Sequence, residues 1–133
     1  MARSAKLPTN LSPARLDLVV YRGDSLSLRL QLLSHGAPVN IDGWVFTAHV
    51  RESPDGVFLQ KFTVDQGVAV PAFGVLRLLL HGVVTDKLPV GVLVWDLQSV
   101  DPFLRVRTLL RGEFVVMADV THVERVVGSG FGG

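Results

Sequence analysis

The four histidines are the first candidates for chemistry, because imidazole binds metals and exchanges protons near neutral pH. They are scattered along the chain, at His35, His49, His81 and His122. No two of them are two residues apart, the spacing that would place two ligands on one face of a strand. The chain also contains no cysteine, which excludes a thiolate zinc site and a disulfide. The sequence therefore predicts no metal site and no cofactor.

Motifs for covalent or phosphate chemistry are missing as well. The sequence has no serine-centred Gly-x-Ser-x-Gly elbow, no phosphate-cradling glycine loop and no Asp/Glu pair in a recognisable acid–base arrangement. Carboxylates that are brought together only by folding leave no such motif. On these grounds we expect a protein that is not an enzyme.

Trp95 beside Asp96 is the most suggestive pair for ligand binding, because an aromatic ring and a carboxylate together often hold sugars. The competing interpretation is a core tryptophan followed by an outward aspartate on one strand. A carbohydrate-binding module would use Trp44, Trp95 and Asp96. An exposed tryptophan ring would favour that function, and two buried rings would favour a structural role.

A cationic row is predicted near the C-terminal end, because Arg105, Arg107 and Arg111 recur on alternate positions of one long strand. Such a row is either a solvated sheet face or a contact with acidic groups on a neighbouring chain. We expect a bulge or bend near Arg111 and Gly112, because a strand of this length does not stay flat.

The composition points to surfaces covered by other proteins. Of the 133 residues, 48% are hydrophobic and only 19% are charged, against about 25% charged in an average domain. No uninterrupted apolar stretch approaches the roughly 20 residues of a spanning helix, and we expect neither membrane insertion nor a secretion signal. A net charge of +1 does not favour nucleic acid. Protein partners remain as the explanation of the apolar excess.

Five alternating runs predict the fold. Their inward members begin at Leu26, Trp44, Phe58, Leu76 and Leu93, and each run places apolar residues on one face and mostly polar residues on the other, with Gln60 as the exception in the third run. Strands this one-sided need a second apolar layer. We expect an all-β fold, an immunoglobulin-like antiparallel β-sandwich of about seven to nine strands. Its core should contain the residues Leu28, Leu30, Trp44, Phe46, Leu78, Trp95 and Leu97.

One strand is apolar on both faces over half its length, because Val92 and Val94 lie opposite Leu93 and Trp95. Such a strand is either central and covered on both sides or lies under a partner. Val92 and Val94 are therefore candidate interface residues, together with Arg105 and Arg107.

Three segments are expected along the chain: an extended arm at residues 1–14, the sandwich at 15–127 and a flexible tail at 128–133. The ends contain too little apolar surface to offset the cost of ordering their backbone. We expect Leu7, Leu11 and Phe131 to insert into neighbouring subunits, with a passive, disordered arm as the alternative.

Four segments resemble a family of small β-sandwich minor tail proteins of bacteriophages and prophages, especially those of actinobacteria. They are YRGDSLSLRLQL, GAPVNIDGWVFTAHVR, LPVGVLVWDLQ and RTLLRGEFVVMADVTH. The chain is also similar to the N-terminal domain of phage baseplate upper proteins. The resemblance covers about residues 18–122, and the family brings no catalytic residues.

The resemblance implies a structural virion protein, made in the bacterial host cytoplasm and built into the tail as a minor tail, tail-tip or baseplate adaptor. Its partners would be other phage tail proteins, with several copies in a symmetric assembly. The chain has no long C-terminal extension that could carry a receptor-binding head, so an adaptor is expected. The alternative is a carbohydrate-binding β-sandwich module of a phage or secreted protein, with glycan contact.

Overall fold

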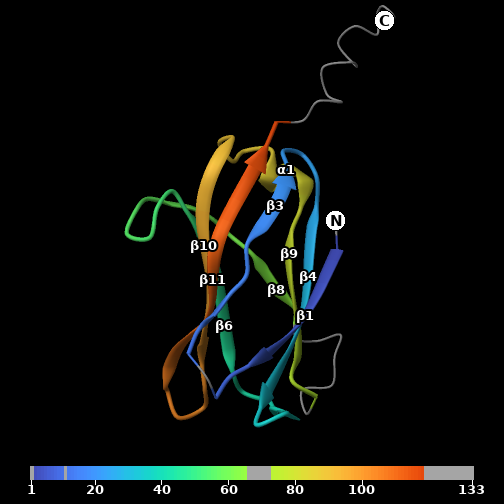
Figure 1. Ribbon diagram of the computed structural model, residues 1–133, viewed down its shortest axis with the longest axis vertical. Coiled ribbons are helices and arrows are strands. Elements are labelled where there is room, and N and C mark those ends of the chain that lie inside the picture. The colour runs from blue at the N-terminus through green and yellow to red at the C-terminus, as the bar shows by residue number, and fades with distance from the viewer. Residues whose placement is uncertain (1, 11, 66–72, 119–133) are drawn as a thin grey trace, which may run out of the picture.

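Two β-sheets pack face to face in the computed structural model, which describes residues 2–10, 12–65 and 73–118 (Figure 1). The first sheet has the order β1 (Ala2–Pro8), β4 (Leu26–Ser34), β9 (Val75–Leu80) and β8 (Thr63–Asp65), with β5 (Ala37–Pro38) beside β4. The second has the order β2 (Ala14–Arg15), β11 (Val106–Met117), β10 (Gly91–Val100), β6 (Val45–Arg51) and β7 (Phe58–Lys61), with β3 (Leu18–Tyr21) also beside β11. A single turn of helix, α1 (Gly82–Thr85), joins β9 to β10. The predicted all-β sandwich is confirmed.

The core lies between the sheets and follows the alternation of the sequence. Along β4 and β10 every second side chain is buried, and those between are partly or fully exposed. The predicted core residues Leu28, Leu30, Phe46, Leu78, Trp95 and Leu97 are all buried in one cluster, and Trp44 is half-buried against it. The register prediction is therefore confirmed.

The first residues form a strand of the sandwich instead of the expected extended arm. β1 pairs with β4 in parallel, from Ala2 beside Ser27 to Pro8 beside Leu33. The Leu7 side chain is only 2% exposed and belongs to the core. Interactions within the chain offset the conformational entropy that this segment loses on ordering, because its backbone hydrogen-bonds to β4 and Leu7 is buried in the core.

The sheets are mixed, whereas the sequence predicted antiparallel ones. The chain reverses after β1 and crosses to the second sheet, where β2 and β3 run parallel to β11. The central pairs β10–β11, β10–β6 and β4–β9 are antiparallel, as expected. The sheets are mixed because the N-terminal strands β1, β2 and β3 pair in parallel with their neighbours at the outer edges of the two sheets. The number of strands, eleven within the described ranges, also exceeds the predicted seven to nine.

A bulge in β11 breaks the predicted arginine row. The partner of Leu97 is Leu110 and the partner of Gln98 is Thr108, so Leu109 is an extra residue. The bulge therefore precedes the expected position at Arg111 and Gly112. Beyond it Arg111 lies opposite Asp96 on the outer face, while Arg107 lies opposite Ser99, which is buried on the inner face. The two arginines consequently belong to opposite faces of the second sheet.

Candidate interaction surfaces

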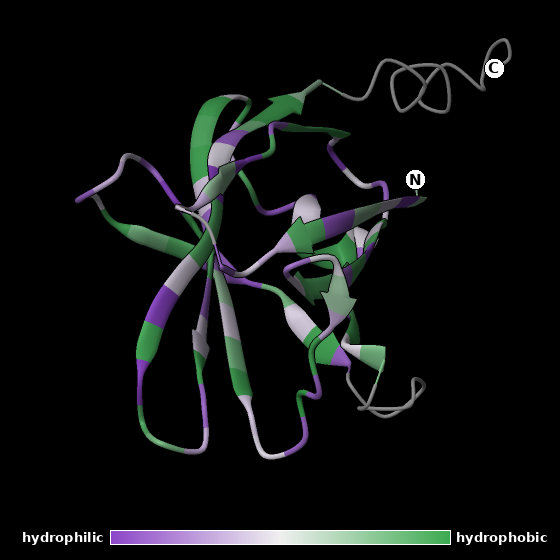
Figure 2. Ribbon diagram, turned by 60° about the horizontal axis from the view of Figure 1, so that its bottom comes forward, coloured by the Kyte–Doolittle hydropathy of each residue, from purple (hydrophilic) through white to green (hydrophobic). Residues whose placement is uncertain are grey.

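An exposed apolar area covers one end of the outer face of the second sheet. It consists of Val19, Tyr21, Val92, Val115 and Met117, which we call the Tyr21 patch. Val115 lies directly between Val19 on β3 and Val92 on β10, and Met117 lies beside Tyr21. Figure 2 shows apolar ribbon along β10 and β11 toward the end of the sheet at which β11 finishes. Cross-strand neighbours of this kind form one continuous surface.

The Tyr21 patch is open although β10 is a central strand. β10 lies between β11 and β6, and its inward side chains are buried by the first sheet. Its outward Val92 is 61% exposed. A strand that is apolar on both faces is normally covered on both. The first of the two possibilities raised by the sequence, a central strand covered on both faces, is therefore not met within the described residues.

A second exposed apolar area lies at the opposite end of the same sheet, in the loop between β10 and β11. Phe103 and Leu104 are 78% and 81% exposed there. Val106, Val100 and Val45 form an adjoining row across β11, β10 and β6, and the two outer valines are exposed. We call the exposed residues Val45, Phe103, Leu104 and Val106 the Phe103 tip.

The carboxylate of Asp101 fixes the conformation of this loop. Its Oδ1 accepts hydrogen bonds from the backbone N–H of Phe103 at 2.9 Å and of Arg105 at 3.0 Å, and its Oδ2 accepts one from Arg105 Nε at 2.7 Å. The Arg105 guanidinium lies 5.2 Å from the centre of the Phe103 ring, a cation–π distance. Leu104 has a φ of 65°, which a non-glycine residue adopts at a cost. These interactions therefore fix the backbone that carries Phe103 and Leu104.

These interactions set the charge of Asp101. Partial burial raises the pKa of Asp101, but the backbone N–H groups of Arg105 and Phe103 and the Arg105 guanidinium lower it by more, so the pKa of this carboxyl lies below its ordinary value. A carboxyl whose folded-state pKa is lowered contributes stability above its unfolded-state pKa and loses it as pH falls through the folded-state pKa.

We therefore expect Asp101→Asn to lower the free energy of unfolding at pH 7. This loss should become progressively smaller below about pH 4, where the wild-type carboxyl begins to be protonated. The check is denaturant unfolding of wild type and variant at pH 7, 4 and 3. Asp55→Asn on the 53–56 turn is a suitable control, because it changes an exposed carboxylate outside the loop. A difference between wild type and Asp101→Asn that stays constant over this pH range would contradict the assignment.

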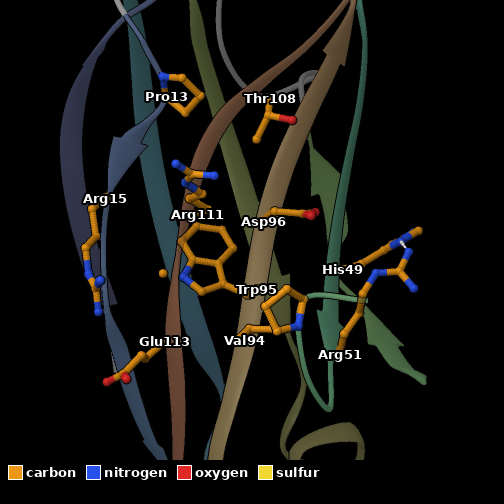
Figure 3. Close-up of a pocket in the computed structure, with 12 residues that line it drawn as sticks. Pro13, Arg15, His49, Arg51, Val94, Trp95, Asp96, Thr108, Arg111 and Glu113 are labelled. Carbon is orange, nitrogen blue, oxygen red and sulfur yellow. Dashed lines mark hydrogen bonds between the residues drawn. The ribbon is translucent and has the colours of Figure 1, made fainter. Parts of the chain in front are cut away.

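Between the two apolar areas, the outer face of the second sheet is hollowed, with a volume of about 620 Å³. Arg15 and Glu113 lie at one side of the hollow, and His49 and Arg51 at the other (Figure 3). Arg51 Nη2 lies 3.1 Å from His49 Nδ1. The hollow is thus a shallow polar depression with a few charged groups.

Charged residues form a row across its floor. Asp96 is paired in register with Arg111 of β11 and with His49 of β6. The Asp96 carboxylate therefore stands beside the Arg111 guanidinium, whose charge it opposes. Nothing in this row resembles an acid–base dyad or a nucleophile with its base.

Two carboxylates border the hollow next to the Tyr21 patch. The backbone N–H of Glu113 donates to Asp17 Oδ1 at 2.8 Å, and this bond, opposed by partial burial and aided by Arg15, lowers the pKa of Asp17. Asp17 forms an exposed ion pair with Arg15 at 3.1 Å. Asp17 is therefore ionised at neutral pH, with its charge balanced by Arg15.

The predicted interface residues are distributed unevenly over these surfaces. Val92 belongs to the Tyr21 patch and Val94 lines the hollow. Arg105 belongs to the rigid loop, and Arg107 is exposed beside it. Leu7 is buried in this chain's own core and cannot serve as an anchor in a neighbour. Two of the predicted residues, Leu11 and Phe131, lie outside the described residues, as does the tail at 128–133.

The proposed sugar-binding set is not assembled. The Trp95 ring is buried and its Nε1 donates to the Leu16 carbonyl, whereas Asp96 points to the opposite face. Trp44 is half-buried beside a separate depression of about 350 Å³ near Asp101 and Phe103. Trp95 therefore offers no ring face to a sugar.

Sequence reasoning missed the Phe103 tip and most of the Tyr21 patch. The sequence does contain a sign of the Phe103 tip. The turn residues Asp101-Pro102 are followed directly by two large apolar residues, at positions where a turn usually has polar side chains. The patch could not be found from one run, because its members come from β3, β10 and β11, which only the parallel pairing of β3 brings together.

Within the described ranges, no group of three or more metal-ligating side chains is close enough to hold an ion. No helix in this part of the chain is both long enough and apolar enough to cross a membrane.

Comparison with solved structures finds a similar sandwich fold in proteins of low sequence identity. The N-terminal domain of phage TP901-1 ORF48 matches with a TM-score of 0.56 and 13% identity, covering 87% of this chain and 98% of that one. PbICP-C, solved in complex with falcipain-2, matches with a TM-score of 0.52 and 12% identity, covering 86% and 99%. No family model matches the sequence, and no curated protein matches it. At such identities the likeness shows the fold alone.

Proposed function

We propose that this protein is a structural component of a bacteriophage tail, a minor tail, tail-tip or baseplate adaptor that acts by binding other tail proteins. The observation that carries this proposal is the pair of exposed apolar surfaces on an otherwise complete sandwich. Large exposed apolar areas on a folded domain are typical of sites covered by protein partners.

Three further observations support the proposal. Four sequence segments resemble phage minor tail proteins, and a phage domain, the N-terminal domain of TP901-1 ORF48, has the same fold over most of both chains. The sandwich of PbICP-C, of similar fold, is found in a complex with another protein. The described side chains form no recognisable catalytic or metal-binding group, and we assign the protein no reaction.

A location in the virion follows from this proposal: the protein is made in the host cytoplasm and joins the tail in several copies. The carbohydrate-binding alternative is not adopted, because the Trp95 ring is in the core and faces away from Asp96.

The test is to delete the gene from the phage or prophage that encodes it. We expect tails purified from the wild type to contain the protein at a constant ratio to other tail proteins. Without it we expect defective tails and a loss of infectivity of several orders of magnitude, restored by the wild-type gene in trans. Mass spectrometry of purified tails and plaque counts measure both effects. Infectious particles of unchanged composition after the deletion would refute the proposal, as would absence of the protein from wild-type tails.

A further inference from the structure

The Tyr21 patch lies at the end of the last described strand. Its member Met117 is the final residue of β11 and pairs with Tyr21, the final residue of β3. The backbone N–H of Arg22 donates to the Met117 carbonyl at 2.9 Å, so the end of β11 is held against β3. Ala118 follows and is exposed. The part of the chain that comes after Ala118 therefore starts at the border of the patch.

The nine residues that follow Ala118, DVTHVERVV, lie outside the described residues, but their sequence suits an apolar surface. Four of the nine are valines, and no more than two polar residues separate one valine from the next: Val120, Val123, Val126 and Val127. Beyond them the run Gly128-Ser129-Gly130 has no apolar side chain. We call residues 119–127 the valine segment. Valine side chains lose little rotamer freedom when they are buried, so this segment can bury apolar surface at a low entropic cost per side chain.

The valine segment is long enough to reach every residue of the patch. Nine extended residues span about 30 Å at about 3.3 Å each. The patch lies on the adjacent strands β3, β11 and β10, so it is only about 10 Å wide at about 4.8 Å between neighbours. A segment tethered at the border meets the patch at an effective concentration on the order of millimolar. The chain's own segment therefore has an advantage over a separate molecule, which must also lose translational freedom on binding.

We propose that the valine segment of this chain covers the Tyr21 patch in the isolated protein. The cover is held weakly, because ordering nine residues loses conformational entropy that offsets much of the gain from burying four valines. A tail protein that presents a larger apolar surface displaces it. This last step rests on the proposed function, and it makes the valine segment a competitor that limits access to the patch until assembly.

Introduced cysteines test the cover in the full chain, because the protein has no cysteine of its own. Val92→Cys places a thiol in the patch, which we call the patch thiol. Val57→Cys places a reference thiol outside it, and the two valines are similarly exposed, at 61% and 64%. Cysteine is itself a small apolar residue, so the patch keeps its character. The readout is the rate of alkylation by N-ethylmaleimide, an uncharged reagent, followed by mass spectrometry.

Each thiol is measured with and without the double substitution Val123→Asp and Val126→Asp, which replaces two apolar side chains of the valine segment with charges. We expect this change to accelerate alkylation of the patch thiol about tenfold and to leave the reference thiol unchanged, because an exposed thiol reacts whenever its cover is off. The matched control, Thr121→Asp with His122→Asp, adds two carboxylates but keeps all four valines, and should accelerate neither thiol. Unfolding midpoints verify that every variant is folded.

Three results would overturn the inference. The first is a patch thiol whose rate the double substitution does not change. The second is an equal acceleration by the matched control, which would assign the effect to charge and not to the valines. The third is protection of the patch thiol that grows with protein concentration, since the cover would then come from a second molecule. Protection that is independent of concentration supports a cover from the same chain.

Failure of the inference is distinguishable from failure of the proposed function. An unprotected patch thiol overturns the inference and leaves the tail role standing, whereas absence of the protein from wild-type tails refutes the proposed function and leaves the alkylation result unchanged. In phage complemented with the Val123→Asp, Val126→Asp chain, we expect the protein in tails at no less than the wild-type ratio, because its patch is open. A loss of incorporation would contradict competition between the valine segment and a tail partner.

Discussion

Replacing Trp95 with alanine is expected to lower the free energy of unfolding by about 3–5 kcal/mol, the range for removing a large aromatic side chain from a core. Trp95 is 2% exposed, its ring lies 5.6 Å from that of Phe62, and its Nε1 donates to the Leu16 carbonyl at 2.7 Å. Truncation leaves a cavity and a carbonyl without its donor. Because a domain has only about 5–15 kcal/mol of stability, a loss of this size lowers the denaturant midpoint severely.

Trp44→Ala is the matched control for Trp95→Ala. Trp44 is half-buried and stacks on Phe46 with ring centres 5.9 Å apart, so its removal exposes less core and should cost clearly less. Chemical unfolding followed by circular dichroism measures both variants. Equal losses, or a larger loss for Trp44→Ala, would contradict the burial assigned to the two rings.

Gly112→Ala is expected to cost about 3 kcal/mol or more, at or above the upper end for overpacked substitutions. A Cβ at this position would overlap the backbone carbonyl of Leu16 and lie 2.8 Å from Asp17 Oδ1. A backbone segment cannot yield as a side-chain end can. The strand β3 and the residues before it would have to move away from β11, which loosens the bond from Leu16 N to the Arg111 carbonyl at 3.0 Å.

Gly36→Ala separates this steric effect from ordinary glycine replacement. Gly36 has a φ of 80°, and no heavy atom lies within 4 Å of the position that an alanine Cβ would take, so only the backbone conformation opposes alanine, at about 1–2 kcal/mol. Unfolding curves of both variants measure the difference. Hydrogen exchange of β3 amides should rise in Gly112→Ala and remain unchanged in Gly36→Ala; the reverse pattern would contradict the close approach of β3 and β11.

The core could be predicted from the sequence because a two-residue period is a local property. Leu28, Leu78 and Trp95 are inward members of separate runs, and each run specifies its own buried face before any pairing is known. The position of β1 could not be predicted in this way. Its segment, ARSAKLP, has one large apolar residue and no alternation, and its place depends on a ladder with β4 whose partners, such as Ala2 and Ser27, are 25 positions apart.

The candidate site was less predictable than the core. Leu109 and Leu110 are two adjacent buried residues, and this break in alternation is the local sign of the bulge that separates Arg107 from Arg111. The Tyr21 patch has no local sign, because it depends on which strands are neighbours. Surfaces assembled across strands follow from topology, and topology is a non-local property of the chain.

The parallel pairing of β3 with β11 also governs the order of events during synthesis. Asp17 and Glu113, hydrogen-bonded at this seam, are 96 residues apart, so the second sheet cannot be completed until nearly the whole described chain has left the ribosome. Until then the leucine stripe of β4 lacks its opposing layer. Chains dominated by such distant contacts fold slowly and expose aggregation-prone surface meanwhile. We therefore expect slow expression at low temperature to raise the soluble yield of this protein.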